Sequence, residues 1–240
     1  MVSKKKKYSW LAVALAIFFA GCGAGYLSLI TARDMVRVAS CANDIKMFEF
    51  ALNDYSLAHD GYLPLISSTT GNLMTDPDGF YPDYMWNTCY AQCEYSHARR
   101  PPGKNDRIDE DMGPGALNDD SFCFLPWELR TEKEGLAFIE AYKSLDMNQR
   151  ENDLTVVVDG KEVVLQRTRI SPDEPNAYYA DAERIPILVE WPNRCHPNAN
   201  VLFADGSYRR MDVGDGFPMT EKFLAGLREI ASINGTLAPK

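Results

Sequence analysis

The chain has 240 residues, of which 45% are hydrophobic and 25% charged, and its formal net charge is −9. These proportions exclude collagen, a low-complexity tail and a fully disordered chain, and the length suits one or two folded domains. Residues 1–32 hold four lysines and no acid, which leaves 21 basic against 34 acidic residues, a net charge of −13, in residues 33–240. An acidic body repels phosphate backbones, so we expect no binding of nucleic acid.

An uncharged apolar stretch near the N-terminus predicts a membrane anchor. Residues 8–32 contain no charged side chain, and as a helix they would measure about 37 Å, enough to cross a hydrocarbon core of about 30 Å. Residues 1–8 form a basic tip that the positive-inside rule keeps in the cytoplasm. We therefore expect a transmembrane helix over 9–32, in a single-pass protein of the cytoplasmic membrane with an extracytoplasmic (periplasmic) C-terminal domain.

The same segment also resembles two kinds of export signal. A basic region followed by an apolar one is the pattern of a cleaved secretory signal peptide. Residues 19–22 (Phe-Ala-Gly-Cys) are similar to a lipobox, in which Cys22 would be lipidated after cleavage. A lipobox usually opens with Leu, Val or Ile, however, and the apolar run continues past Cys22 to Ile30. An uncleaved anchor is therefore the preferred interpretation.

The helix is expected to continue beyond the membrane in residues 33–65. Neither Pro nor Gly occurs between Ile30 and Gly61, and apolar residues recur at steps of three and four, which is typical of one buried helix face. Gly61 and Pro64 would end the helix. One continuous helix over 9–59 would be about 75 Å long, with its outer half packed on a soluble domain. The apolar stripe consists of Val38, Cys41, Ile45, Phe48, Leu52 and Tyr55.

Three segments in and just after this helix, and a fourth near the C-terminus, resemble a known bacterial family. They read ASCANDIK (39–46), ALNDY (51–55), HDGYLP (59–64) and HPNANVLFADGS (196–207). They are similar to the Cys-x-Asn-Asn-Leu-Lys, Ala-Leu-x-x-Tyr, Gly-x-(Phe/Tyr)-Pro and His-x9-Asp-Gly motifs of pseudopilin-like proteins with a prepilin-type N-terminal helix. The middle of the chain shows no such likeness.

The resemblance implies a pilin-like fold and a structural role. The chain would be a subunit of an envelope, pilus-like or secretion assembly, in contact with other protein subunits through its N-terminal helix. His196, Asn200, Asp205 and Gly206 would form a structural motif, with His196 tethering the start of a strand. A catalytic pair of His196 and Asp205 is the alternative, but no nucleophile motif accompanies it. We expect no enzyme activity and no catalytic residues.

Two features depart from the family pattern. Eight residues rather than nine separate His196 from Asp205. The glycine and the fifth-position glutamate of the prepilin cleavage site are also missing, since residues 7–11 read KYSWL. We therefore expect a pilin-shaped protein that no prepilin peptidase processes and that stays in the membrane.

The remaining sequence predicts an α+β fold, in which the long N-terminal helix packs on an antiparallel sheet. Residues 66–127 are rich in turn-forming residues and tyrosine, and are expected to form a loop-rich insertion. Residues 128–240 are expected to supply the α+β C-terminal part.

Several local patterns predict the elements of that C-terminal part. A capping box at Thr131 begins a helix, residues 185–191 indicate a buried strand, and residues 221–233 indicate a final amphipathic helix. Two Asp-Gly pairs predict hairpins, the second with a type I′ turn. These pairs are Asp159-Gly160 and Asp205-Gly206.

Five cysteines lie outside the membrane segment, which allows at most two disulfides and leaves one thiol over. In an oxidising compartment, we expect disulfides to hold the loop-rich middle to the sheet or to the helix. Their pairing stays open, with Cys41 a candidate for the remaining buried thiol. The disulfide candidates are Cys41, Cys89, Cys93, Cys123 and Cys195.

A metal site is the alternative use of these cysteines. Cys89, Cys93 and His97 are four residues apart, which on a helix would place them along one side. Cys195 or His196 could complete a tetrahedral site. The spacing is not that of common zinc knuckles and oxidation competes for the thiols, so no metal is expected.

Calcium is a further alternative, because acidic clusters offer oxygen ligands. Neither cluster in this chain fits an EF-hand loop, and solvated acidic loops are commoner, so we expect no cofactor. The two clusters are Asp76, Asp78 and Asp83, and Asp106, Asp109, Glu110 and Asp111.

Aromatic residues gather in the insertion and allow two interpretations. They either contact a partner protein or glycan, or fill a small core beneath the loops. The first interpretation supports an alternative function, that of an anchored or lipidated module that binds a ligand or protein through residues 66–127. The aromatic residues are Tyr81, Tyr84, Trp86, Tyr90 and Tyr95.

Overall fold

The computed structural model of the chain describes residues 4–85, 88–91, 117, 121–174, 177–192 and 198–233. The chain divides into two compact units, Met1–Ser40 and Cys41–Lys240. Some predicted site residues lie outside the described residues, namely Cys93, His97, Cys195, His196, Trp86, Tyr95 and the acidic cluster of 106–111.

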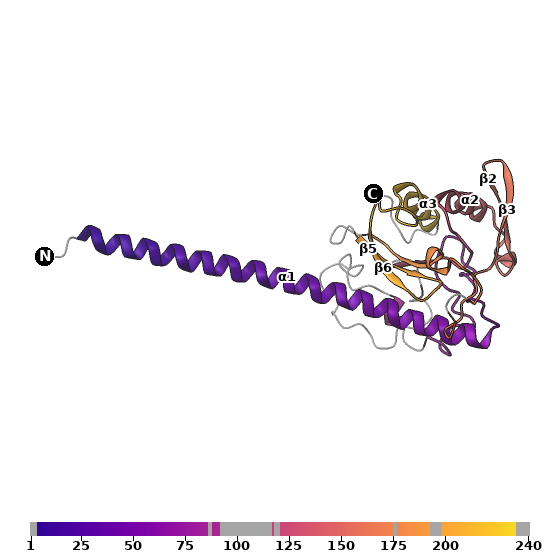
Figure 1. Cartoon of the computed structure of the whole chain (residues 1–240), viewed down its shortest axis with the longest axis horizontal. Helices are drawn as coiled ribbons and strands as arrows, with labels where there is room; N and C mark the ends of the chain where they lie inside the picture. The colour runs from indigo at the N-terminus through magenta and orange to yellow at the C-terminus, as the bar shows by residue number, and fades with distance from the viewer. Residues whose placement is uncertain are drawn as a thin grey trace. The chain divides into compact units, whose positions relative to one another are not determined.

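Helix α1 covers Lys4–Ala58 (Figure 1), and its first part makes up the described portion of the Met1–Ser40 unit. Apolar side chains in this portion are exposed, among them Leu29 at 71% and Val36 at 70%. Within the described residues, no helix combines the length and the apolar character that a membrane crossing needs. The transmembrane helix over 9–32 stays a prediction.

From Cys41 onwards, α1 belongs to the second unit and buries one face. The predicted apolar stripe is confirmed here, because Ile45, Phe48 and Leu52 are fully buried and Tyr55 is half-buried. The side chain of Val38 is not among those that the structure describes. The stripe packs on a four-stranded sheet, as expected.

The sheet is antiparallel throughout, with the strand order β1-β4-β5-β6. Strand β1 lies near the C-terminal end of the segment 66–127, which was expected to be loop-rich, and was not predicted. Strand β4 confirms the buried strand expected over 185–191. The strands are β1 Phe122–Phe124, β4 Pro186–Glu190, β5 Asn198–Phe203 and β6 Tyr208–Asp212.

A separate two-stranded sheet contains β2 (Leu154–Val158) and β3 (Lys161–Leu165). Asp159 and Gly160 connect them with φ angles of 51° and 76°. Two positive φ angles in a two-residue loop define a type I′ turn. The first predicted hairpin is confirmed.

Two further helices, α2 (Glu132–Lys143) and α3 (Glu221–Ser232), confirm the helices predicted in the C-terminal part. The capping box is present at α2, where Thr131 Oγ1 accepts from the backbone N–H of Glu134 and the Glu134 carboxylate accepts from the backbone N–H of Thr131. The described residues also contain three short 3-10 helices: η1 Thr88–Ala91, η4 Met147–Gln149 and η5 Ala182–Arg184.

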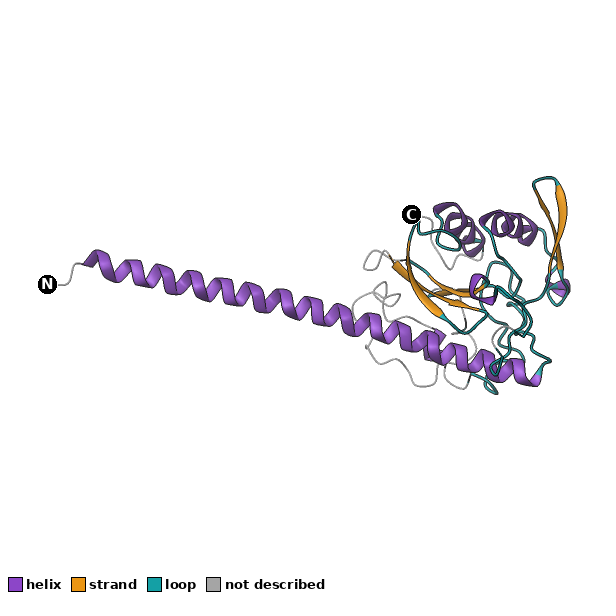
Figure 2. Ribbon diagram, viewed as in Figure 1, coloured by secondary structure: helices purple, strands orange, loops and turns teal. Residues whose placement is uncertain are grey.

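The four-stranded sheet separates two hydrophobic cores. On one face, Phe122, Leu188 and Leu202 pack with the stripe of α1. On the other face lies a second core, which includes Phe138 of α2 and Leu227 of α3. Figure 2 shows the sheet between the end of α1 and the α2–α3 pair. The α+β class is therefore confirmed, with helices on both faces of the sheet.

Candidate functional site

Two of the segments that resemble family motifs, 39–46 and 196–207, contact each other in the structure. Lys46 Nζ donates to the carbonyl oxygen of Gly206 at 3.4 Å and lies 5.2 Å from the ring centre of Tyr208. Lys46 also pairs with Glu49, at 2.5 Å. A Cβ atom on Gly206 would lie 3.1 Å from Glu49 Oε1. Lys46 of ASCANDIK and Gly206 of the Asp-Gly pair thus belong to one helix–hairpin contact.

The turn at Asp205-Gly206 differs from the predicted type I′ turn. The backbone N–H of Gly206 donates to Phe203 O at 3.0 Å, and Gly206 has a φ of 77°. Asp205 does not have the positive φ that a type I′ turn requires. The hairpin instead closes with a 203–206 turn followed by a glycine bulge. The Asp205 carboxylate accepts from the Ser207 backbone N–H at 2.9 Å and from its hydroxyl at 2.6 Å.

Asn200 holds a buried carboxylate that the sequence analysis did not single out. Glu190 on β4 is 5% exposed, and its Oε2 accepts from Asn200 Nδ2 at 2.7 Å and from the Asn200 backbone N–H at 3.0 Å. A buried carboxylate needs such donors. Asn200 therefore has a structural role, whereas His196 lies outside the described residues and its predicted roles stay untested.

The Asp-Gly-Tyr segment after α1 reverses the chain direction. Asp60 and Gly61 have positive φ angles of 53° and 86°, and the Gly61 N–H donates to Ser56 O at 2.8 Å. The Tyr178 ring packs on Gly61, and a Cβ atom there would lie 2.5 Å from the Tyr178 hydroxyl oxygen. Glycine is needed at 61 both for the backbone conformation and for the space.

Replacing Gly61 by Ala is expected to lower the free energy of unfolding by about 2–3 kcal/mol. Gly160→Ala is the matched control, because Gly160 has a φ of 76° but a Cβ atom there would have no other atom within 4 Å. We expect the control to cost about 1 kcal/mol. Urea unfolding followed by circular dichroism measures both, and equal costs would mean that the Tyr178 contact is readily relieved.

Two arginines of the 167–169 segment support the end of α1. Arg169 Nε donates to Asp60 O at 3.0 Å, and its guanidinium stacks against the rings of Tyr62 and Tyr178, at 4.9 and 4.1 Å. A cation is favourable there because helix carbonyls point towards the C-terminal end. Arg169 therefore stabilises the chain reversal at the end of α1 from the solvent side.

Arg167 stabilises the same chain reversal from the buried side. It is 8% exposed and donates to the carbonyl oxygens of Leu63 and Pro64, at 3.3 Å for Pro64. Burial lowers the pKa of Arg167, although nearby tyrosine and acidic side chains oppose this shift. The sequence offered no signal that distinguished the buried Arg167 from the half-buried Arg169.

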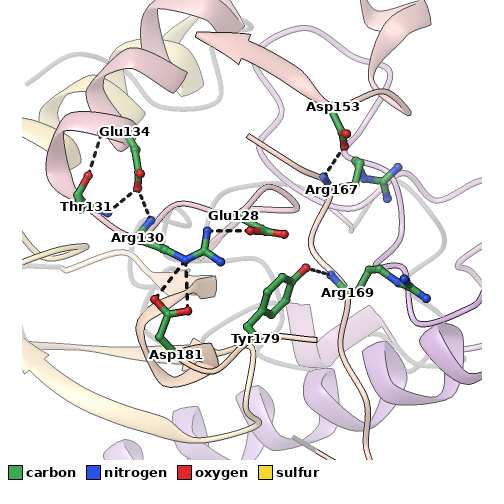
Figure 3. A network of polar contacts seen from close by, with 9 residues as sticks. All are labelled: Glu128, Arg130, Thr131, Glu134, Asp153, Arg167, Arg169, Tyr179 and Asp181. Atoms are coloured by element: carbon green, nitrogen blue, oxygen red, sulfur yellow. Dashed lines mark hydrogen bonds and ion pairs between the residues drawn. The ribbon is translucent and has the colours of Figure 1, made fainter. Parts of the chain in front are cut away.

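Figure 3 shows a polar network beside this region. Arg130 pairs with Glu128 at 2.7 Å and with Asp181 at 3.2 Å, and its guanidinium lies 5.5 Å from the Tyr179 ring centre. Burial lowers the pKa of Arg130, but hydrogen bonds and attraction to Glu128 and Asp181 outweigh this, so the net shift is upward. These ion pairs connect the start of α2 to η5.

Tyr179 joins this network to the 167–169 segment. Its hydroxyl accepts from the Arg169 backbone N–H at 2.9 Å. Burial raises the pKa of Tyr179, and the nearby Glu128 carboxylate raises it further, against the opposing effect of the Arg169 bond. Tyr179 is therefore neutral near pH 7. Tyr179 thus connects the 167–169 segment to Arg130.

The first calcium candidate is contradicted by an ion pair. Asp76 is 4% exposed, and its Oδ2 lies 2.5 Å from Arg150 Nη2. Its Oδ1 accepts from the Asp78 backbone N–H at 3.0 Å. A guanidinium thus holds the carboxylate that would bind Ca²⁺. Across the described residues, no group of three or more His, Cys, Asp or Glu side chains could hold a metal ion, and the candidate of Cys93 and His97 lies outside them.

The structure describes the side chains of two cysteines of the second unit, Cys41 and Cys123, and places them in different cores. Cys41 is buried in the core between α1 and the sheet, and Cys123 is buried in the core on the other face. The two are therefore not brought together. Cys93, Cys195 and the side chain of Cys89 lie outside the description, so the predicted disulfides stay predictions.

Two aromatic residues of the insertion fill a core. Tyr81 and Tyr84 pack on the core between α1 and the sheet. The Tyr84 ring lies 5.1 Å from that of Tyr55 and 5.7 Å from that of His59, in edge-to-face geometry. For these two tyrosines the core interpretation is confirmed.

No known protein-family model, curated protein or solved structure matches this chain. The resemblance to pseudopilin-like proteins therefore rests on the four short motifs.

Proposed function

We propose that this protein is a membrane-anchored, pilin-like structural or assembly subunit of an envelope, pilus-like or secretion assembly, and that it performs no catalysis. The contact of Lys46 with Gly206 carries the proposal. It brings together two distant segments that resemble family motifs and gives both a structural task.

The packing of α1 supports the pilin-like part of the proposal. The end of the helix packs on one face of an antiparallel sheet through Ile45, Phe48 and Leu52. In the pattern that the motifs resemble, an N-terminal helix likewise supports a C-terminal sheet. The polar groups around the motifs bind one another, which suits a scaffold better than a reaction centre.

Exposed apolar side chains support the anchor. In the Met1–Ser40 unit, Leu27, Leu29 and Val36 are 65–71% exposed. So much apolar surface on one helix would be costly in water. Lipid, or the helices of other subunits, would cover it, with the basic tip in the cytoplasm and the C-terminal domain outside.

An anchored or lipidated binding module is the second candidate. Cys22 is exposed, which suits lipidation at the lipobox-like sequence. Binding through the 66–127 insertion is less well supported, since Tyr81 and Tyr84 pack on the core.

The intact mass of the protein extracted from membranes tests the anchor. The expected result is the mass of the full chain, near 27.0 kDa, with or without the initiator Met. A mass that begins at Cys22 with an added diacylglycerol would contradict the uncleaved anchor and favour the second candidate. In the Cys22→Ser variant, a lipoprotein would lose this processing, whereas an uncleaved anchor would be unchanged.

Native electrophoresis of gently solubilised membranes tests the assembly role. We expect the protein to migrate in a complex well above its own mass. A protein that is anchored but always monomeric would contradict the role of an assembly subunit.

A further inference from the structure

The exposed side of α1 in the Cys41–Lys240 unit carries apolar and acidic groups together. Phe50 and Leu57 are 59% and 64% exposed, and Asp54 lies between them on the helix. Steps of four and three residues place all three on one helix face. Phe48 and Leu52 on the opposite side are fully buried. We call Phe50, Asp54 and Leu57 the helix face.

The outer edge of the sheet carries basic groups. Strand β6 is an edge strand, and its residues Tyr208, Arg209 and Arg210 are exposed. We call these three residues the β6 edge. They stand out in a body with a net charge of −13.

Hydrogen bonds to neutral oxygens hold the two arginines in place, so their positive charges are not compensated by these bonds. Arg209 donates to Glu183 O and Arg210 to Asn198 Oδ1, both at 2.9 Å. The Arg209 guanidinium also lies 4.6 Å from the Phe203 ring centre. In the described part of the chain, both hydrogen-bond to neutral oxygens and neither makes an ion pair.

We propose that the helix face of one copy of this chain docks on the β6 edge of a second copy. Asp54 would meet Arg210, while Phe50 and Leu57 would pack on the Tyr208 ring and the Arg210 stem, which lie on the same face of β6. This inference rests on the proposed function, because it names a partner for an assembly subunit.

Charge selects this pairing over pairing between like surfaces. Two helix faces would bring Asp54 close to its equivalent, and two β6 edges would bring four arginines together. Arginines on an edge strand also discourage backbone pairing with another strand, so the contact would be made by side chains.

Sedimentation of the full-length protein in detergent tests the proposal. We expect Asp54→Lys and Arg210→Glu each to weaken self-association about three- to tenfold. The double variant Asp54→Lys/Arg210→Glu should regain most of it, because the opposite charges meet again in reversed order. Raising the salt about tenfold should weaken the native association, because salt screens exposed charges.

Matched controls separate docking from general charge and surface effects. Asp173→Lys and Lys222→Glu reverse exposed charges elsewhere and should leave association unchanged. Phe50→Ser should weaken association, whereas Val157→Ser, at a residue 65% exposed on the separate hairpin, should not. Circular dichroism verifies that every variant folds.

Failure of the double variant to regain association would overturn the docking, as would equal effects in the controls. A purified native chain that stays monomeric at all concentrations would also overturn it. If that chain still enters a larger membrane complex, the proposed assembly role stands without homotypic docking. If the intact mass instead reveals a processed lipoprotein, the uncleaved anchor is contradicted. The association measurements still test the docking of the helix face on the β6 edge.

Discussion

Phe48→Asp is expected to unfold the Cys41–Lys240 unit. Phe48 is fully buried, and its ring lies 5.9 Å from that of Phe80. Loss of a buried phenylalanine ring costs about 3–5 kcal/mol, and burying an unpaired carboxylate adds several more. Domains of this size are stable by about 5–15 kcal/mol, so little stability would remain. Limited proteolysis and circular dichroism of the full chain in detergent measure the effect.

Phe50→Asp is the matched control, on the same helix and two residues away. Phe50 is 59% exposed, so we expect a change in unfolding free energy within about 0.5 kcal/mol. If Phe48→Asp stayed as protease-resistant as Phe50→Asp, the packing of α1 on the sheet would be wrong.

Arg150→Leu should have the second largest effect, a loss of about 3–5 kcal/mol of unfolding free energy. Asp76 is 4% exposed and Arg150 20% by side chain. Without its guanidinium partner, the Asp76 carboxylate would be a buried charge, and the Asp78 N–H would be its one remaining donor among the described residues. Urea unfolding with a tryptophan fluorescence signal measures the loss.

The double variant Asp76→Asn/Arg150→Leu tests the cause. It removes the unpaired charge, so it should be more stable than Arg150→Leu alone by about 1–3 kcal/mol. If both variants were equally destabilised, the loss would come from the packing of the Arg150 side chain. Added Ca²⁺ should not rescue Arg150→Leu, and rescue would revive the calcium site.

Local sequence patterns predicted elements where one physical rule dominates. The apolar stripe of α1 follows from helical periodicity, the start of α2 from the reciprocal bonds of Thr131 and Glu134, and the β2–β3 hairpin from Asp159-Gly160. Each of these patterns is complete within a few residues of its element. Such patterns do not depend on which other segments lie nearby.

Elements that depend on distant partners were missed. Strand β1 has only three residues, all buried, and owes its strand conformation to pairing with β4. Strand β4 is buried on both faces, so its sequence does not alternate and did not reveal that α2 and α3 cover the second face. The same holds for Glu190 and Arg167, whose burial comes from residues far away in sequence.

Three residues of the predicted motif lie close together in the structure. The motif residues Asn200, Asp205 and Gly206 lie in one hairpin, and that hairpin contacts α1 through Lys46. No sequence rule related Lys46 to Gly206, because 160 residues separate them. The resemblance placed both in motifs but not in contact.

The glycine bulge at Gly206 affects which substitutions the β5–β6 hairpin should accept during evolution. Gly206 alone has a positive φ in this turn, whereas the side-chain oxygen of Asp205 binds Ser207. Homologous chains should therefore vary to Asn or Ser at position 205 while keeping glycine at 206. At the β2–β3 turn both residues have positive φ, so exchanges there should be confined to Asn, Asp and Gly. The two Asp-Gly pairs look alike in sequence but are under different constraints.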